Sequence, residues 1–469
     1  MIRYTLHRLF LTLPTLIIVL AFSFLLKSLA PGDEVARILE LNGVSEQLGK
    51  EIYLNSYKET SARFHLDKPQ FYFSILPSYF PDTLHRIIPM SKRELLKSLV
   101  IQTKDWEKVD RFNKSLRSGQ SKNLERDTIF RTIGMELLKF DQDRSLQSII
   151  QRKNKLSQLC KESNCPIEVS NIIYSIEQLE LSNRISFPQF RLNGMRCQFH
   201  YWISSLFSSK SNISLRDGAP VYNKIWRALK WSLSISIPTF ILLALCALTI
   251  AKIQVHHHQT IVDRGISGLL YLLYSTPLFW LSTVAVIFFT TDEYGTWTNL
   301  FPSIGLRPIF KELTFFEELS RNMKQLILPI ICSIIGGVSY IAIQLKSDLL
   351  NALNQPYSVM AQAKGLSPNQ IINKHALPNA LVPYITVLTG AIPNIFAGSV
   401  IIEVIFNIPG MGRLLFRSIQ ELDWPVVFTI ILISAIITSL GYLIGDLLLA
   451  KLYPKLRTSL ISNSSVQNS

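Results

Sequence analysis

The chain has 469 residues, of which 48% are hydrophobic and only 17% are charged, and its mean hydropathy is +0.24. Soluble globular proteins carry about 25% charged residues, so the composition excludes an ordinary soluble protein. The net charge of +15 suits an anionic bilayer surface, and no RNA- or DNA-binding motif supports a nucleic-acid partner. Apolar residues gather at the N-terminus and beyond Trp231, so we expect a membrane protein with one large polar region between them.

Six apolar segments are predicted to cross a bilayer. A hydrocarbon core of about 30 Å needs about 20 mostly apolar residues in a helix. Inside that core every backbone polar group must be paired within its own segment, so we expect continuous helices and an all-α bundle. The predicted spans are 9–29, 232–251, 265–290, 325–345, 381–402 and 426–449.

Two glycine pairs predict close helix packing, because glycine lets two backbones approach each other. Gly336 and Gly337 lie in the fourth span, and Gly441 and Gly445 lie in the sixth. The alternative is that they are chance glycines in apolar sequence. Pro277 lies inside the third span, where we expect a kink.

The orientation follows from basic residues near the ends. Arg3 and Arg8 favour a cytoplasmic start, and an even number of spans then returns the C-terminus to the cytoplasm. The polar region between the first two spans would lie outside. The first segment could instead be a cleaved signal sequence, since 28–30 resembles a cleavage site, but its length favours a retained span.

The polar region is predicted to form a small helical domain between about Ser91 and Asn183. Ser91 and Glu94 fit a capping box, and the apolar residues that follow have helical spacing, namely Leu95, Leu96, Leu99 and Val100. Its many charged residues are typical of a solvated surface, so we assign it no chemistry.

The cysteines are too few and too scattered for a disulfide scaffold. If the polar region lies in an oxidising compartment, Cys160 and Cys165 could pair, or either could pair with Cys197. Free thiols remain an alternative.

The segment 354–380, between the fourth and fifth spans, predicts a helix, a turn and a second helix. Lys364 and Gly365 are typical of a helix C-terminus. Ser367 and Gln370 form a second capping box, and Pro378 is predicted to break the second helix before the fifth span. A short helix held crosswise between two spans would suit a docking element, because a partner that pushes on it can tilt both spans.

This segment resembles the EAA loop of ABC-importer permeases in the spacing of Ala361, Ala363, Gly365, Leu377 and Pro378. The stretch AKGLS followed by HALPNALVPYITVL looks like the dipeptide/oligopeptide permease version. Other stretches resemble that family in the same order, at 3–33, 65–72, 214–225, 275–281, 400–415 and 423–427. The resemblance covers most of the chain except roughly 76–196.

The resemblance implies a permease subunit of an ATP-driven importer of dipeptides or oligopeptides in the bacterial inner membrane, with the type I ABC-importer permease fold. Its implied partners are a second, similar permease, two cytoplasmic ATPases and an extracytoplasmic peptide-binding protein, besides membrane lipid. The sequence has no G-x-x-x-x-G-K-[ST] phosphate loop, so we expect no catalytic residues and no bound cofactor. ATP and Mg²⁺ would act on the partner ATPases.

These inferences divide the chain into four parts. We expect an N-terminal span (1–30), an extracytoplasmic region (31–227) with a helical insertion at about 77–196, a permease domain (228–450) and a cytoplasmic tail (451–469).

The resemblance also implies two sets of functional residues. The ATPase-coupling loop would use Ala361, Ala363, Lys364, Gly365, Ser367, His375, Leu377 and Pro378. A mouth of the transport pathway would involve Glu403, Pro409, Gly410 and Gly412, although an ordinary loop is the alternative. The chain departs from the family pattern where Val359 replaces the glutamate that names the loop and where Gln362 stands in place of a frequent arginine.

His256, His257 and His258 suggest a metal site, but adjacent side chains on a helix do not share a face and no carboxylate or cysteine pattern accompanies them. We therefore predict no metal site. Two other functions remain open: a nickel-type permease of the same family, and a membrane-anchored binding or assembly protein built around the helical insertion.

Overall fold

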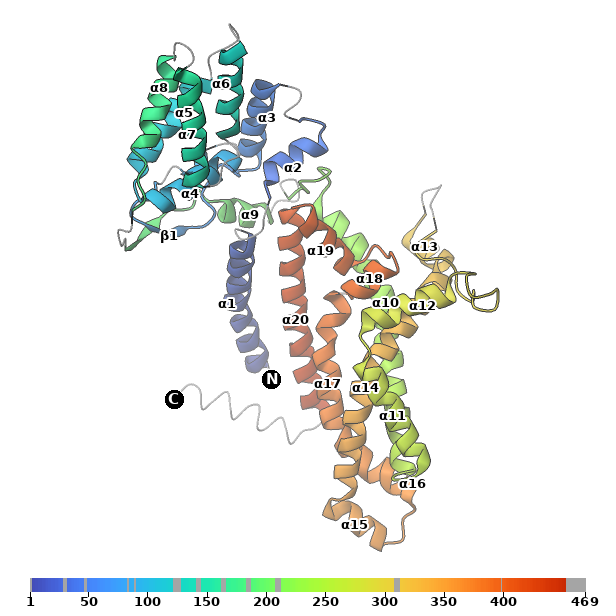
Figure 1. Ribbon diagram of the computed structural model, residues 1–469. Coiled ribbons are helices and arrows are strands. Elements are labelled where there is room, and N and C mark those ends of the chain that lie inside the picture. Colours follow the sequence, from blue (N-terminus) through green and yellow to red (C-terminus); the bar gives the residue numbers. More distant parts are fainter. Residues whose placement is uncertain are drawn as a thin grey trace. The chain divides into compact units, whose positions relative to one another are not determined.

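The computed structural model describes residues 2–27, 32–45, 49–81, 84–87, 90–120, 128–140, 145–161, 166–182, 187–206, 212–307, 313–397 and 399–452. The chain divides into two compact units (Figure 1). The membrane unit comprises Met1–Ala30 and Asn212–Ser469, and the polar unit comprises Pro31–Ser211.

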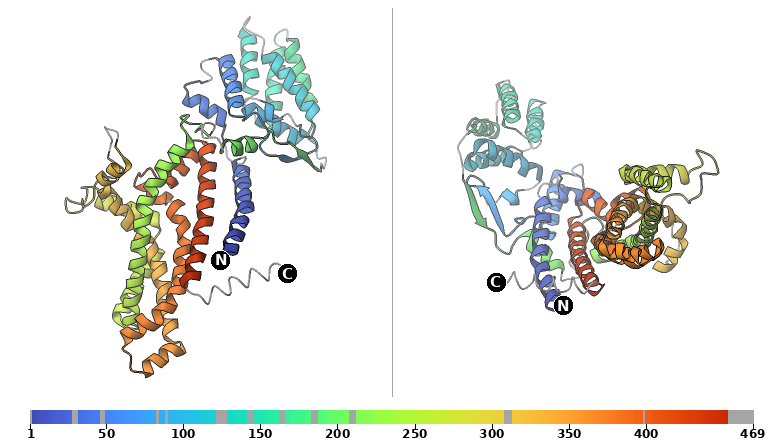
Figure 2. Two further views of the ribbon diagram at one scale, coloured as in Figure 1. Left: turned by 180° about the vertical axis from the view of Figure 1, so that it is seen from behind. Right: turned by 90° about the horizontal axis from the view of Figure 1, so that it is seen from below.

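The membrane unit is built from helices, which Figure 2 shows from two further directions. They are α1 (Ile2–Lys27), α10 (Val221–His256), α11 (Ile261–Ser275), α12 (Leu278–Phe289), α13 (Phe315–Arg321), α14 (Met323–Leu353), α15 (Pro356–Ala363), α16 (Pro368–Ile371), α17 (Leu377–Ala397), α18 (Val400–Ile405), α19 (Met411–Gln420) and α20 (Trp424–Leu452).

Within the described residues, four helices are long and apolar enough to cross a membrane: Phe10–Lys27, Val221–His256, Met323–Leu353 and Trp424–Leu447. A fifth crossing results if α11 and α12 together form one span, although the two are bent by 98°. The chain does bend at Pro277, where a kink was predicted, but the bend is a complete break between two helices, so the prediction of one continuous helix over 265–290 is wrong. Thr276 is extended, as residues before proline usually are, so the helix ends there and α12 begins after Pro277.

The predicted fifth span, 381–402, also differs from the structure. Helix α17 begins earlier, at Leu377, and ends at Ala397. Ser399 is extended and accepts a hydrogen bond from the Ile402 amide through its hydroxyl, which starts the separate helix α18.

Glycines allow the central helices to pack closely, as the sequence predicts. A Cβ atom on Gly337 of α14 would lie 2.5 Å from Cδ1 of Leu243 in α10, and one on Gly336 would meet α12. A Cβ atom on Gly445 of α20 would lie 2.7 Å from Cβ of Thr389 in α17. At Gly445 the approach is to the Cβ atom of Thr389, which is fixed to its backbone, so a larger residue there would push α20 and α17 apart. At Gly336 and Gly337 the nearest atoms are the flexible ends of Leu278 and Leu243, which a new Cβ atom would displace.

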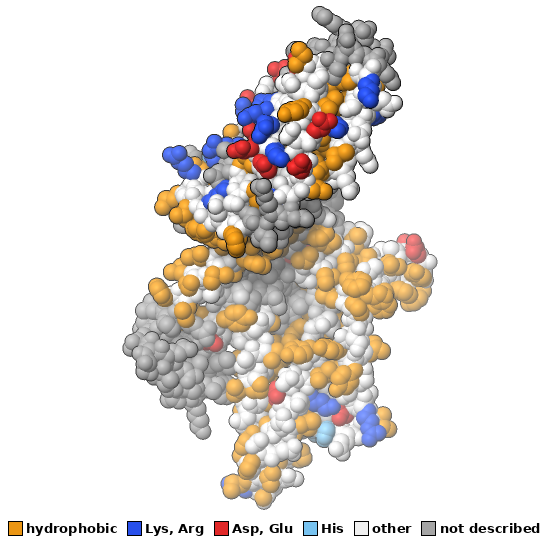
Figure 3. All heavy atoms as spheres, turned by 60° about the vertical axis from the view of Figure 1, so that its left-hand side comes forward, with side chains coloured by type: hydrophobic (Ala, Val, Ile, Leu, Met, Phe, Trp, Pro, Cys, Tyr) orange, Lys and Arg blue, Asp and Glu red, His pale blue; other side chains and the backbone are white. Residues whose placement is uncertain are grey.

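Side chains on the visible face of the two units differ in character (Figure 3). Hydrophobic side chains dominate the membrane unit, whereas most of the visible Lys, Arg, Asp and Glu side chains lie on the polar unit. An apolar outer surface of this kind is what lipid-facing helices require.

The polar unit is mostly helical, as predicted. It comprises α2 (Glu34–Leu41), α3 (Lys50–Arg63), β1 (Phe73–Pro77), a 3₁₀ turn (Leu84–Arg86), α4 (Met90–Thr103), α5 (Trp106–Gln120), α6 (Thr128–Lys139), α7 (Leu146–Lys161), α8 (Ile167–Glu177), β2 (Pro188–Leu192) and α9 (Gln198–Leu206).

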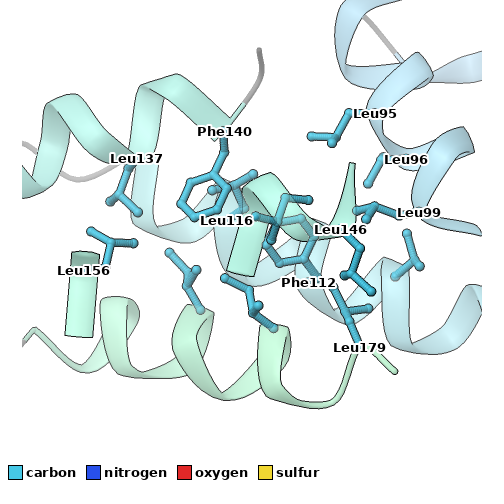
Figure 4. Packing of buried hydrophobic residues seen from close by; sticks show 14 of the residues in the cluster. Leu95, Leu96, Leu99, Phe112, Leu116, Leu137, Phe140, Leu146, Leu156 and Leu179 are labelled. Carbon is cyan, nitrogen blue, oxygen red and sulfur yellow. The ribbon is translucent and has the colours of Figure 1, made fainter. Parts of the chain in front are cut away.

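Helices α4 to α8 bury a shared apolar core (Figure 4). The four residues predicted from their spacing, Leu95, Leu96, Leu99 and Val100, are buried in it. They meet Phe112 and Leu116 of α5, Phe140 after α6, and Leu146 and Leu156 of α7. Helix α4 begins at Met90, so Ser91 lies inside the helix and not at its cap.

Strands β1 and β2 form an antiparallel two-stranded ribbon that the sequence did not predict. The pairing runs from Phe73 opposite Leu192 to Pro77 opposite Pro188. The two ends of the predicted insertion are therefore adjacent in space, and helices α4 to α8 lie between them in the sequence.

Cys160 of α7 is disulfide-bonded, while Cys197 is buried with a free thiol. Both alternatives that pair Cys197, with Cys160 or with Cys165, are therefore wrong, and Cys165 itself lies outside the described residues.

A buried carboxylate connects α6 to α7. The Glu136 side chain accepts hydrogen bonds from Lys155 at 2.8 Å, from Lys139 at 3.0 Å and from Arg152 at 3.1 Å. The bonds from Lys155 and then Lys139 outweigh burial and lower the pKa of Glu136 to about 2.

We predict that Glu136→Gln weakens this contact. Because the pKa is lowered in the folded state, the stabilisation is complete above pH 4.5, the ordinary value, and is lost as the pH falls towards about 2. At neutral pH the variant should lower the local free energy of opening of α6 and α7 by about 1–3 kcal/mol, and this difference should vanish near pH 2. Amide hydrogen exchange of the full chain in detergent measures it.

The matched control is Glu177→Gln, since Glu177 forms an exposed pair with Lys153 at 3.1 Å. Exposed pairs contribute about 0–1 kcal/mol. Equal effects of the two variants would contradict the role given to Glu136.

Candidate functional site

The loop between α14 and α17 forms a helix and a turn with defined ends. Helix α15 lies across the end of α14 (Figure 1) and starts with Pro356. At its C-terminus the Gly365 amide donates to the Gln362 carbonyl at 2.9 Å and the Leu366 amide donates to the Ala361 carbonyl at 3.4 Å. This pair of bonds is a Schellman motif, and Gly365 has the φ of +80° that the motif requires. The predicted C-terminal glycine is confirmed.

The predicted capping box at the start of α16 is confirmed too. Ser367 is the N-cap and Pro368 the first helical residue, and the Ser367 amide donates to Oε1 of Gln370 at 3.1 Å. The turn between α15 and α16 is thus held by local hydrogen bonds at both ends, which gives it one preferred geometry.

The prediction that Pro378 ends the second helix of the loop is wrong, because the helix continues through Pro378 into α17. A single π-helical turn, Ile372–Ala376, joins α16 to α17, and the Leu377 amide donates to the carbonyl of Ile372, five residues back. Proline has no N–H for the carbonyl four residues before it. One wider turn ahead of Pro378 accommodates that loss without ending the helix.

The inner side of this loop is fixed to α14. The Ser358 hydroxyl donates to the Ala352 carbonyl at 2.8 Å. Ile372 and Ala376 of the π turn are buried in the same apolar cluster as Leu345 and Leu349 of α14. The loop is therefore packed on the helix that precedes it.

The outer side of α15 is apolar and exposed. Met360 is 63% exposed and Val359 is 55% exposed, and Tyr357 of the same helix is also exposed. Sequence reasoning missed Met360 and treated Val359 only as a departure from the family pattern. Their signal was a pair of adjacent large apolar residues in a helix that the sequence places outside the bilayer.

The predicted coupling residues lie in this loop with different exposures. Ala361 is buried, His375 and Leu377 are half-buried, and the exposed residues are Ala363, Lys364, Gly365, Ser367 and Pro378.

A buried ion pair lies at the same end of the bundle, where α10 turns into α11 (Figures 1 and 2). The Lys346 Nζ of α14 lies 2.5 Å from Oδ1 of Asp263 in α11 and donates to the Ser267 hydroxyl at 3.1 Å. The Gln254 side chain and the Gln259 amide also donate to Asp263. This pair attaches α14, two turns before its end, to α11.

The three histidines that suggested a metal site lie at the end of α10. His256 is the last residue of the helix, and His257 and His258 follow it. His258 Nδ1 lies 3.5 Å from Oδ2 of Asp263. Across the described part of the chain, no group of three or more His, Cys, Asp or Glu side chains is placed to hold a metal ion.

The predicted pathway-mouth residues meet at the other end of the bundle. Glu403 of α18 is only 2% exposed. Its carboxylate accepts from the Ser232 hydroxyl of α10 at 2.7 Å and from the Arg413 amide at 2.9 Å. Gly410 lies against this carboxylate so closely that no Cβ would fit. In this chain Glu403 connects α18, α10 and α19.

Gly412 approaches the backbone of Val400, where a Cβ atom would lie 2.8 Å from its Cα. Pro409 is half-buried between α18 and α19. The two glycines therefore have a packing reason that the sequence alone did not give.

A second buried carboxylate joins two distant segments at this end. The Ser214 hydroxyl donates to Asp423 at 2.6 Å, and the Leu215 amide donates to it at 2.9 Å. Burial raises the pKa of Asp423, while the bond from Ser214 opposes this shift. Ser214 and Asp423 each begin a stretch that resembles the permease family, so the structure brings these two stretches together.

Comparison with known proteins gives the family. The family model described as "binding-protein-dependent transport system inner membrane component" matches residues 244–458. A putative peptide transport system permease protein of Brucella abortus is 30% identical over 230 residues, which cover 49% of this chain and 70% of the relative. The chain belongs to this family of inner-membrane transport components.

Other relatives of this permease have similar coverage. The oligopeptide transport system permease protein AppB of Bacillus subtilis is 28% identical over 260 residues, 55% of this chain and 79% of the relative. The dipeptide transport system permease protein DppB of Lactococcus lactis is 29% identical over 262 residues, 55% of this chain and 80% of the relative. The permease is thus a multi-pass protein of the inner membrane, and the resemblance seen in the sequence is confirmed.

We predict that Lys346→Met destabilises the membrane unit by about 2–4 kcal/mol, because it leaves the buried Asp263 carboxylate without its cation. The double variant Lys346→Met/Asp263→Asn should recover most of this loss, since neither charge then remains. Thermal unfolding of the purified chain in detergent measures both. Lys324→Met is the control, because Lys324 is exposed on the same helix. A double variant as unstable as the single one would rule out the ion pair as the cause.

Proposed function

We propose that this chain is the permease subunit of an ATP-driven importer that carries dipeptides or oligopeptides across the bacterial inner membrane. The names of the relatives in Bacillus, Brucella and Lactococcus support this cargo. The nickel-type permease has no support among these names, and neither does an assembly protein built around the polar unit.

The observation that carries the proposal is the exposed apolar side of α15. The side chains of Val359 and Met360 are exposed on one side of α15, and Ser358 fixes the other side to α14. An apolar patch on a short rigid helix suits a groove on another protein. We propose that a cytoplasmic ABC ATPase binds this patch, and that Lys364 and Gly365 lie at the edge of the contact.

The loop is connected to both helices that flank it, α14 and α17, so it can transmit movement to each of them. Ser358 connects α15 to the end of α14, and the π turn continues without a break into α17. A displacement of α15 therefore moves the ends of two long helices together. Lys346 adds a third helix, because it pairs with Asp263 of α11.

The same family resemblance supports the other partners. The subunit would pair with a second, similar permease to enclose the pathway, would receive peptides from an extracytoplasmic binding protein, and would share two ATPases. The chain has no phosphate-loop motif, so ATP and Mg²⁺ would be bound and ATP hydrolysed by the ATPases.

We further propose six crossings with both termini in the cytoplasm. To the four long helices this adds the bent pair α11–α12 and helix α17, whose 21 residues suffice for one crossing. The loop with α15 then lies in the cytoplasm and the polar unit outside. The disulfide at Cys160 supports an outer location, since disulfides persist in oxidising compartments.

Met360→Glu should abolish binding of the ATPases. A carboxylate placed in an apolar contact loses its hydration without gaining a partner, at a cost of several kcal/mol, so the affinity should fall at least tenfold. Co-purification of the permease with its co-expressed ATPases measures this. Met323→Glu is the matched control, because Met323 is 61% exposed at the opposite end of α14. Undiminished binding by Met360→Glu would refute the docking role of α15.

Single cysteines can test the orientation in spheroplasts. A membrane-impermeant maleimide should label Asn171→Cys in the polar unit but should label Lys364→Cys only after the membrane is permeabilised, since both positions are exposed. The unmodified chain gives the background from its own cysteines. Labelling of Lys364→Cys in intact spheroplasts would place the loop outside and contradict the proposal.

A further inference from the structure

One side of the β1–β2 ribbon carries only large apolar side chains and is exposed. Phe73 is opposite Leu192, and Ile75 is opposite Phe190, so these four side chains share one face of the ribbon. They are between 41% and 80% exposed. The rings of Phe73 and Phe190 stack at 5.4 Å. We call these four residues the apolar ribbon face.

The opposite face of the ribbon is the one that the polar unit covers. Leu76 packs against the core of α4 to α8, and the Arg191 guanidinium donates to the Phe80 carbonyl at 2.7 Å. A ribbon with one side packed on a core normally presents polar residues on its other side. This ribbon presents apolar residues instead, which indicates that something other than water meets the face.

The sequence around the ribbon indicates what meets it. The polar unit begins directly after α1 and ends shortly before α10, and both helices are apolar enough to cross a membrane. Helix α9 and two connecting segments, 193–197 and 207–220, lie between β2 and α10. Because the unit is attached to the membrane at both ends, a bilayer surface is present at high effective concentration.

The chemistry of the face fits lipid better than protein. Protein interfaces contain about one hydrogen bond per 100–200 Å², but these four side chains have no donor or acceptor. Aromatic and aliphatic groups beside a cation are typical of segments that lie in the interfacial layer of a bilayer. The exposed cation Arg196 and the exposed Met195 follow closely after β2.

We propose that the apolar ribbon face lies in the interfacial layer of the outer leaflet and holds the polar unit against the membrane. The outer leaflet rests on the topology proposed above. The contact is shallow, because a two-stranded ribbon has two outer edges, and backbone groups at such edges are accommodated by water or lipid headgroups and not by hydrocarbon. The ribbon thus serves as an additional membrane contact between the first two spans.

Photo-crosslinking in the full chain, expressed with its partners in cells, tests this. p-Benzoylphenylalanine replaces Phe190 or Leu192, and the control position is Gln189, which is also exposed but points to the opposite face of β2. We expect adducts with the mass of a phospholipid at Phe190 and Leu192, at least fivefold more than at Gln189. Adducts mainly to a binding protein, to another permease or to a second copy of the chain would overturn the proposal. Equal yields at all three positions would overturn it as well.

The labelling of Asn171→Cys in the same cells separates the two proposals. If Asn171→Cys is labelled from outside but no lipid adduct forms, the lipid contact is refuted and the topology stands. If Asn171→Cys is not labelled, the topology is refuted and the outer leaflet with it.

Discussion

The close packing of α14 on its neighbours is the contact on which the membrane unit depends. Gly336 and Gly337 leave room for the side chains of Leu278 in α12 and Leu243 in α10 to lie directly against α14. Lipid tails are as apolar as leucine, so helices in a bilayer associate through close packing and hydrogen bonds and not through exclusion of water. Helix α14 also carries Lys346 and continues into α15. The position of the loop is therefore set by how tightly α14 fits.

Polar contacts also fix how the helices of the bundle are arranged. Asp263, Glu403 and Asp423 are buried, and each accepts several hydrogen bonds. Each joins segments that are distant in the sequence, at one end of the bundle or the other. A buried carboxylate with all its partners specifies one arrangement of the helices, because any other arrangement would leave the charge unpaired.

Much of this could be predicted from the sequence because it depends on local patterns. The length of the apolar segments predicted the long helices, and the residue types at 364–370 predicted the turn of the loop. Prolines were harder, because their effect depends on the chain around them: Pro277 separates two helices at 98°, whereas Pro378 is accommodated by one π turn. Pairs such as Lys346 with Asp263 depend on tertiary contacts, and neither residue has a local signature.

The β1–β2 ribbon was missed for a related reason. Its strands are five residues each and lie more than a hundred residues apart, so no turn signal joins them. Pairing of Pro77 with Pro188 brings the ends of the helical segment together. A large segment can occupy such a point without separating the flanking chain.

The π turn at Ile372–Ala376 has a consequence for the evolution of the loop. A helix advances by about 100° per residue, so the one extra residue in that turn rotates everything before it relative to α17. The exposed surface of α16 and the side of α17 that packs in the bundle are therefore set separately. Deleting a single residue there would restore an ordinary helix and turn the exposed surface of the loop away from its present direction, even though every side chain on that surface were kept.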